Sequence, residues 1–163
     1  MLRKTVVLIA FAALAALAGC PGAEKTAPSS SAPDFTLPDL SGKKVRLADQ
    51  KGKVVLIEFW ATWCPPCRSS IPVIERLHRT YGGKGLVVLA ISMDEGGWDK
   101  VKAFTAEQGI TYSVLQGNDD VSTKYLVRMI PAVFLVDKQG NIAKQFIGGG
   151  SEADMEKEIK ALL

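Results

Sequence analysis

The chain of 163 residues is 47% hydrophobic and 23% charged, a composition typical of a globular protein and not of a disordered or collagen-like chain. This length allows one domain of ordinary size. The 20 Lys and Arg exceed the 17 Asp and Glu by three, and by only one if Arg3 and Lys4 are removed with an N-terminal segment. A chain so near neutrality offers no basic patch to a polyanion, so we expect no nucleic acid among its partners.

The first 19 residues predict a bacterial export signal. Arg3 and Lys4 precede an unbroken apolar run over 6–18, which is shorter than the roughly 20 residues of a membrane-spanning helix and fits the apolar core of a signal peptide. The run ends in the sequence LAGC at 17–20, which resembles the lipobox of bacterial lipoproteins. This resemblance implies cleavage before Cys20 and lipid on that cysteine. The alternative is an ordinary signal peptide that happens to contain a cysteine.

Residues 20–33 predict a flexible tether, because Pro, Ser, Ala and Gly predominate there without apolar periodicity. The folded domain is expected over 34–163, which is long enough for one core without disulfide stapling. Several acyl chains on Cys20 would hold the protein stably at a lipid surface. The expected location is the periplasm or the outer face of the cytoplasmic membrane, and sorting to the outer membrane is left open.

Apolar patterns and turn signals predict the secondary structure in chain order. They predict a β-hairpin over 34–47 turning at 41–42, an apolar strand at 53–60, a helix at 65–81, a strand at 86–93, a helix at 98–108, a short strand at 112–115, a short helix at 119–127, a hairpin with strands at 132–136 and 142–147, and a closing helix at 151–163. Strands that alternate with helices and then end in a hairpin predict an α/β fold with a mixed central sheet and helices on both faces.

Two cysteines remain once Cys20 is assigned to lipid. Their position favours a redox role over that of a stabilising disulfide. Cys64 and Cys67 lie where a buried strand meets a helix, at a spacing that allows a disulfide. At the start of the helix, unpaired N–H groups stabilise an anion, so Cys64 is expected to supply the attacking thiolate. Cys67 falls inside the first turn, is expected to be more buried, and would act as the resolving thiol. Pro65 is well tolerated at the first helical position.

Half of a zinc site is one alternative reading of this pair. Zinc needs two further ligands, and the only histidine, His78, lies eleven residues beyond Cys67 on the same predicted helix, roughly 16 Å away. We therefore expect no metal and no cofactor beyond the redox-active disulfide, and we place His78 on the helix surface. A passive structural disulfide is the other alternative.

The sequence FWATWCPPC at 59–67 resembles the active-site signature of thioredoxin-like proteins. The lipoprotein-like start, the N-terminal hairpin and the long middle segment at 94–127 resemble the membrane-anchored TlpA/ResA-type branch. The resemblance covers nearly all of 34–163. It implies a thioredoxin-like fold with an N-terminal β-hairpin and a central αβ insertion, and it implies a protein thiol–disulfide oxidoreductase.

The same resemblance gives roles to residues outside the cysteine pair. It implies a cis peptide bond at Ile130-Pro131, facing the pair, whose backbone would bind an extended substrate segment. Without the resemblance, Pro131 also fits the start of an ordinary strand. We expect Trp63 and Pro65 to contribute to the substrate contact, with Trp63 partly exposed. Trp60 is expected in the core.

Glu58 stands alone as a carboxylate in an otherwise apolar strand. Burial of an anion is costly, so the pKa of Glu58 is expected to rise. The resemblance implies that Glu58 lies beneath Cys67 and relays its proton. The alternative is an edge position from which Glu58 points into water.

The two prolines between the cysteines bear on the direction of electron flow. Proline has no N–H to donate to the Cys64 thiolate. A less stabilised thiolate favours a more reducing couple, so we expect a reductant of protein disulfides. Such a reductant would need a membrane thiol donor for its own re-reduction. The resemblance makes apocytochrome c, during cytochrome c maturation, one candidate substrate.

Two other functions remain open at this point. Peroxiredoxins share the opening sequence APDF at 32–35, but Ala61 occupies the place of their threonine before the peroxidatic cysteine. A copper chaperone could bind Cu(I) through both thiolates. Peroxide consumption and metal titration would separate these functions from disulfide exchange.

Overall fold

A computed structural model describes residues 30–163. The predicted signal peptide, Cys20 and most of the predicted tether lie outside the described residues. None of the helices within 30–163 combines the length and the apolar character that crossing a bilayer requires.

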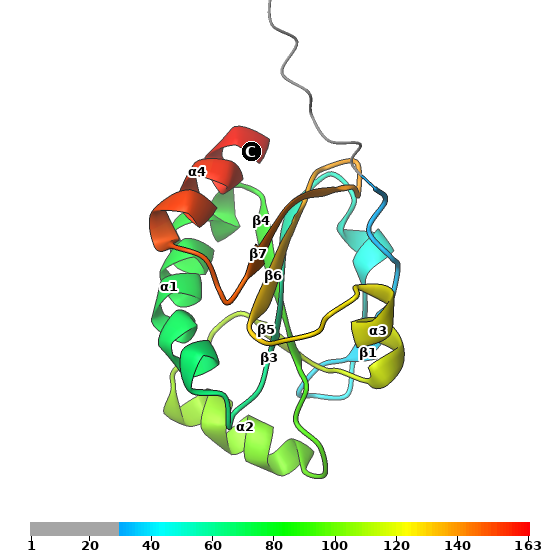
Figure 1. Ribbon diagram of the computed structural model, residues 1–163, viewed down its shortest axis with the longest axis vertical. Helices are drawn as coiled ribbons and strands as arrows, with labels where there is room; N and C mark the ends of the chain where they lie inside the picture. Colours follow the sequence, from blue (N-terminus) through cyan, green and yellow to red (C-terminus); the bar gives the residue numbers. More distant parts are fainter. Residues whose placement is uncertain (1–29) are drawn as a thin grey trace, which may run out of the picture.

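A five-stranded mixed sheet forms the centre of the molecule, in the order β5-β4-β3-β6-β7 (Figure 1). The strands are β3 (Val54–Trp60), β4 (Leu86–Ser92), β5 (Ser113–Gln116), β6 (Ala132–Val136) and β7 (Ile142–Ile147). The first three are parallel to one another, whereas β6 runs antiparallel to β3 and β7 antiparallel to β6. All seven residues of β3 are buried, because this strand is central and covered on both faces.

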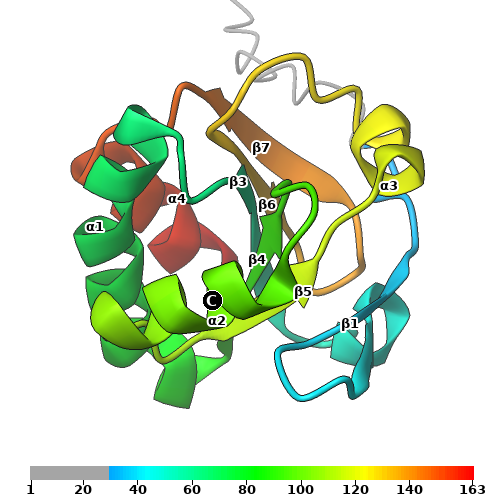
Figure 2. The same cartoon turned by 90° about the horizontal axis from the view of Figure 1, so that it is seen from below.

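Helices cover both faces of this sheet, as predicted (Figures 1 and 2). On one face lie α1 (Pro65–Tyr81), α2 (Trp98–Glu107) and α4 (Glu152–Leu162). The other face is covered by the short helix α3 (Asp119–Lys124) and by the N-terminal hairpin. The fold class predicted from the sequence is therefore confirmed.

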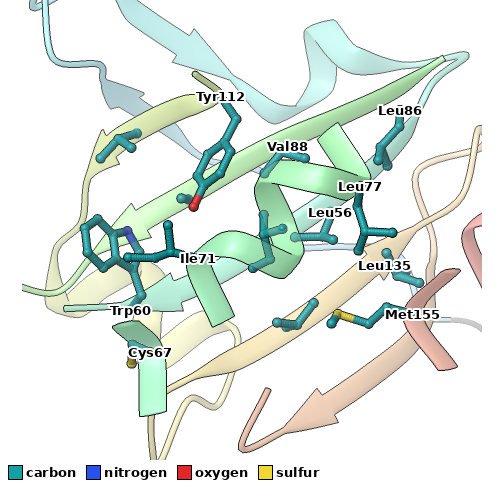
Figure 3. Packing of buried hydrophobic residues seen from close by; sticks show 14 of the residues in the cluster. Leu56, Trp60, Cys67, Ile71, Leu77, Leu86, Val88, Tyr112, Leu135 and Met155 are labelled. Atoms are coloured by element: carbon teal, nitrogen blue, oxygen red, sulfur yellow. The ribbon is translucent and has the colours of Figure 1, made fainter. Parts of the chain in front are cut away.

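The core beneath α1 is built from residues at helical spacing that meet alternate residues of the strands. Ile71 and Leu77 of α1 pack with Leu56 of β3, Leu135 of β6 and Met155 of α4 (Figure 3). Each of these side chains is at most 3% exposed. Full burial of one such side chain stabilises a fold by roughly 1.5–3 kcal/mol relative to exposure, so this layer holds α1 firmly against the sheet.

The N-terminal hairpin is a separate two-stranded sheet of β1 (Thr36–Pro38) and β2 (Lys44–Arg46). Asp39 closes its turn, because one carboxylate oxygen accepts hydrogen bonds from the N–H groups of Ser41 at 2.8 Å and Lys43 at 3.0 Å. An isolated bridge between Asp39 and Leu115 joins the hairpin to β5. The predicted turn at 41–42 is confirmed.

Contacts with the domain begin before residue 34, the predicted start of the folded part. Ser31 forms an antiparallel bridge with Asn141, and the Ile142 N–H donates to the Ser30 carbonyl at 2.9 Å. Ala32 is buried beside them. Residues 30–33, which the sequence analysis assigned to the tether, therefore pack on the loop before β7. The composition of residues 20–33 could not indicate this pairing, because Asn141, the partner of Ser31, is more than 100 residues away in the sequence.

The helix predicted at 119–127 is shorter than expected. It ends at Lys124, and Leu126 takes a left-handed conformation with φ of 53°. The N–H groups of Leu126 and Val127 fold back to the carbonyls of Thr123 and Ser122 and satisfy the end of the helix. Such a terminus favours glycine, so a leucine there gave no signal that the helix stops.

Candidate active site

The two cysteines form a disulfide at the start of α1, directly after β3 ends. Their Cα atoms are 5.3 Å apart. Cys64 is the N-cap of the helix, and its sulfur accepts a hydrogen bond from the Cys67 N–H at 3.3 Å. Pro65 and Pro66 fill the next two positions and have no N–H to offer. The Cys67 amide is therefore the one backbone donor to Cys64 Sγ among the described residues.

The two cysteines differ in their access to solvent. Cys67 is fully buried, whereas Cys64 keeps 3% of its surface exposed. Cys67 is thus the more buried of the two, as predicted. Trp63 beside them is 62% exposed and Trp60 is in the core, also as predicted. The small exposed surface of the pair therefore belongs to Cys64.

A cis peptide bond joins Ile130 to Pro131, opposite the disulfide. The Ile130 carbonyl oxygen lies 3.8 Å from Cys64 Sγ. Met129, just before this bond, is 59% exposed, which the sequence analysis did not anticipate. The expected proline geometry is therefore present, and it places a backbone acceptor against the accessible cysteine.

Glu58 lies in the middle of β3 with Ala90 of β4 and Val133 of β6 as its cross-strand neighbours. It is only 1% exposed, so the alternative of an edge position is wrong. Burial raises the pKa of Glu58 to about 8, opposed by a hydrogen bond that Ser70 Oγ donates to Oε1 at 2.7 Å. The carboxyl is therefore mostly protonated at neutral pH.

Comparison with known proteins identifies the family of this chain. The model of the AhpC/TSA family matches residues 28–145. The chain belongs to this thioredoxin-like family. The thiol-disulfide oxidoreductase ResA of Geobacillus thermodenitrificans is 36% identical over 142 residues, which cover 85% of this chain and 81% of that protein. The thioredoxin-like protein YneN of Bacillus subtilis is 37% identical over 130 residues, covering 78% and 76% of the two chains.

A solved structure has the same fold. A Chlorobium tepidum protein assigned as the thiol:disulfide interchange protein DsbE superposes with a TM-score of 0.77 at 34% identity, over 82% of this chain and 96% of its own. The thioredoxin-like fold implied by the sequence resemblance is confirmed. With the bonded Cys64–Cys67 pair, the chain is a thiol–disulfide oxidoreductase of the ResA/DsbE type.

Two polar residues of the oxidoreductase site were not identified from the sequence. Asp94, just after β4, accepts hydrogen bonds from the Thr62 N–H at 2.9 Å and from the hydroxyl of Ser92 at 2.9 Å, and fixes the turn that carries Trp63. Ser70, one turn after Cys67, bonds Glu58. The i, i+3 spacing of Cys67 and Ser70 was the available signal for a shared helix face.

His78 differs from its expected place on the helix surface. It is half-buried, with its ring edge-on to Tyr112 at a centroid distance of 6.0 Å, and its Nδ1 is buried without a hydrogen-bond partner. Residues 30–163 contain no group of three or more His, Cys, Asp or Glu placed to hold a metal ion. His78 thus belongs to the packing between α1 and the segment before β5.

Replacement of Glu58 by glutamine should change how stability depends on pH. The folded protein holds the Glu58 proton up to a pKa of about 8, whereas the unfolded chain releases it near 4.5. The contribution of this proton is fully present below pH 4.5 and is lost as pH rises toward 8. Relative to Glu58→Gln, we expect the free energy of unfolding of the wild type to fall by on the order of 4 kcal/mol across this window.

Urea unfolding of the oxidised proteins at a series of pH values measures this difference. Glu75→Gln is the matched control of opposite sign: partial burial raises the pKa of Glu75, but hydrogen bonds from Thr111 and Arg79 and the charge of Arg79 together lower it below its ordinary value. A constant difference between wild type and Glu58→Gln from pH 4.5 to 8 would contradict the assignment.

Proposed function

We propose that the chain is a membrane-anchored, extracytoplasmic reductant of protein disulfides, in which Cys64 attacks and Cys67 resolves. The observation that supports these roles best is the difference in access between the cysteines. Cys64 holds all of the exposed surface of the pair and sits at a helix start, whereas Cys67 is sealed beneath it. Helix N-termini favour thiolates.

The exchange proceeds in two displacements. The Cys64 thiolate attacks one sulfur of the substrate disulfide, a bond forms between the two proteins, and the other substrate sulfur leaves as a thiolate. The Cys67 thiolate then attacks Cys64 Sγ, which releases the second substrate thiolate and leaves the Cys64–Cys67 disulfide. Two electrons pass from the enzyme to the substrate.

Glu58 is proposed as the proton acceptor for Cys67. Its neighbour Ser70 Oγ lies 2.7 Å from both Glu58 Oε1 and the Cys67 carbonyl oxygen, so the carboxyl lies beside the turn that carries the resolving cysteine. The pKa of Glu58, at about 8, lies close to the reference pKa of an unperturbed cysteine thiol, about 8.5. The carboxylate can therefore take the proton without a large driving force in either direction.

The substrate contact is proposed to run between two sets of residues. Trp63 and Pro65 lie exposed on one side of Cys64, and Ile130 and Pro131 lie on the other. An extended segment of a partner protein could bind the backbone at Ile130 as an added strand. Apocytochrome c with oxidised haem-binding cysteines is one substrate of this kind.

Substitution of each cysteine should separate the two roles. Cys67→Ala lacks the resolving thiol, so we expect it to accumulate a mixed disulfide with substrate proteins through Cys64. Cys64→Ala should accumulate none, because Cys67 is buried. Non-reducing gel electrophoresis of acid-quenched cells measures the adducts. A Cys67→Ala variant that traps no protein and consumes peroxide as fast as wild type would instead indicate a thiol peroxidase.

The direction of electron flow depends on the hydrogen-bond donors that surround Cys64 Sγ. A side-chain cap normally accepts from the N–H of the second or third helical residue. Here the second is Pro66, which leaves only the Cys67 N–H at 3.3 Å. Fewer donors stabilise the thiolate less, which makes the couple more reducing.

We expect a reduction potential at or below about −250 mV, toward that of thioredoxin at about −270 mV. Pro66→Ala restores the missing donor and should raise the potential by about 30 mV, the equivalent of one hydrogen bond of about 1.4 kcal/mol. Pro65→Ala is the control, because the first helical N–H does not reach the cap. Equilibration of residues 21–163 with dithiothreitol measures all three. A wild-type value above about −180 mV would overturn the direction.

The anchor is proposed from the lipobox-like sequence before Cys20, and a membrane thiol donor would then re-reduce the pair from the same surface. We expect Cys20→Ser to move the protein from the membrane fraction to the soluble extracytoplasmic fraction. Disulfide exchange by the purified protein should stay unchanged, since the redox pair is Cys64 and Cys67 and does not include Cys20. Cell fractionation with immunodetection measures the shift. Retention of Cys20→Ser in the membrane fraction would contradict lipid attachment at this residue.

A further inference from the structure

A buried carboxyl that relays protons needs a route to solvent. Glu58 is enclosed by its neighbours on β4 and β6 and by α1. The buried indole N–H of Trp60 has no hydrogen-bond partner and so offers no chain of polar groups. Ser70 Oγ is the one group among the described residues that is hydrogen-bonded to the Glu58 side chain.

The Ser70 hydroxyl has two acceptors within reach and one proton to give. It lies 2.7 Å from Glu58 Oε1 and 2.7 Å from the Cys67 carbonyl oxygen. A hydroxyl donates one hydrogen bond and can accept two. When Glu58 is ionised, the hydroxyl donates to the carboxylate. When Glu58 is protonated, the hydroxyl can turn to the carbonyl and accept the Glu58 O–H.

Ser70 also reaches the surface of the protein. It is half-buried and lines a hollow of about 300 Å³. The walls of the hollow come from the start of α1, from α4, and from the glycine run between β7 and α4: Pro66, Ser69, Ser70, Val73, Gly148, Gly149, Gly150 and Met155. This hollow is the place where solvent comes nearest to the hydrogen-bond partner of Glu58.

The three glycines give the hollow its form. All three have positive φ, between 67° and 99°. A Cβ at Gly150 would lie 2.7 Å from Phe146 Cδ1, and one at Gly149 would lie 3.4 Å from Pro131 Cγ. The positive φ values and the close approach of Gly150 to Phe146 therefore favour glycine in this turn. The wall facing Ser70 consequently carries no side chains that could fill the hollow.

We propose that Ser70 is the positioning residue through which Glu58 exchanges its proton with solvent in this hollow. The inference rests on the proposed relay role of Glu58 and extends it. Glu58 carboxylate takes the proton of the Cys67 thiol and leaves the attacking thiolate. Protonated Glu58 donates its proton to Ser70 Oγ while the Ser70 hydroxyl proton passes to water in the hollow. Glu58 is then again a carboxylate and Ser70 again a hydroxyl, and the net change is the transfer of one proton from the Cys67 thiol to water.

Three variants of residues 21–163, a fragment that contains every described residue, test this route. Ser70→Ala removes the hydroxyl, and Ser70→Thr keeps it. Ser69→Ala is the matched control, because Ser69 lines the same hollow but bonds the Pro65 carbonyl at 3.3 Å and not Glu58. Urea unfolding first establishes that all variants are folded.

The first readout is hydrogen–deuterium exchange of the Glu58 carboxyl, followed by infrared spectroscopy of the oxidised protein after transfer into D₂O at pH 6. The carbonyl stretch of Glu58 is assigned by its loss in Glu58→Gln. We expect Ser70→Ala to slow this exchange about tenfold or more, and Ser70→Thr and Ser69→Ala to match wild type. Equal exchange rates in Ser70→Ala and wild type would overturn the proposal.

The second readout is the pH profile of single-turnover disulfide reduction. Ser70→Ala loses the donor to the ionised carboxylate, so the midpoint of the profile should move upward by about one pH unit, and Ser70→Thr should restore it. A Glu58→Gln profile identical to wild type would refute the relay itself. A changed Glu58→Gln profile with an unchanged Ser70→Ala profile would refute only the role of Ser70.

Discussion

The structure depends on how directly β3 runs into α1. Four residues separate the end of the most buried strand from the start of the longest helix. The apolar residues of both elements pack in one buried cluster. Asp94 ties the connecting turn to the end of β4. The result is a helix N-terminus held at the end of the central strand, with Cys64 as its N-cap.

The burial of Glu58 in the same strand is energetically unfavourable. In the middle of a fully buried strand the ionised form of the carboxyl is disfavoured, because it loses its hydration. A leucine at this position would pack without that cost. Stability therefore gives no account of this residue, whereas the proposed proton transfer with Cys67 would give one. Buried titratable groups with displaced pKa values are common at functional sites for this reason.

Much of this arrangement is visible in the sequence. The apolar run of β3, the helical spacing of Ile71 and Leu77, and the cysteine spacing are local patterns, and local patterns predicted the elements and the redox pair. The pairing of Ser31 with Asn141 and the half-burial of His78 depend on segments distant in the chain. The turn at Leu126 is local, but a leucine in a left-handed conformation gives no sequence signal. Ser70 was missed for another reason: its spacing from Cys67 indicates a shared helix face, but no local pattern indicates its hydrogen bond to Glu58 of β3.

The pairing of Ser31 with Asn141 has a consequence for orientation. Asn141 belongs to the loop between β6 and β7, which lies at the end of the sheet where β3 begins, since Gly52 bonds Lys138 there. Cys64 lies at the end where β3 finishes, and Figure 1 shows the chain entering at the opposite pole. A seven-residue strand spans about 20 Å. The proposed N-terminal anchor and the redox centre therefore lie at opposite ends of β3, and a membrane thiol donor has to reach across this length to re-reduce the pair.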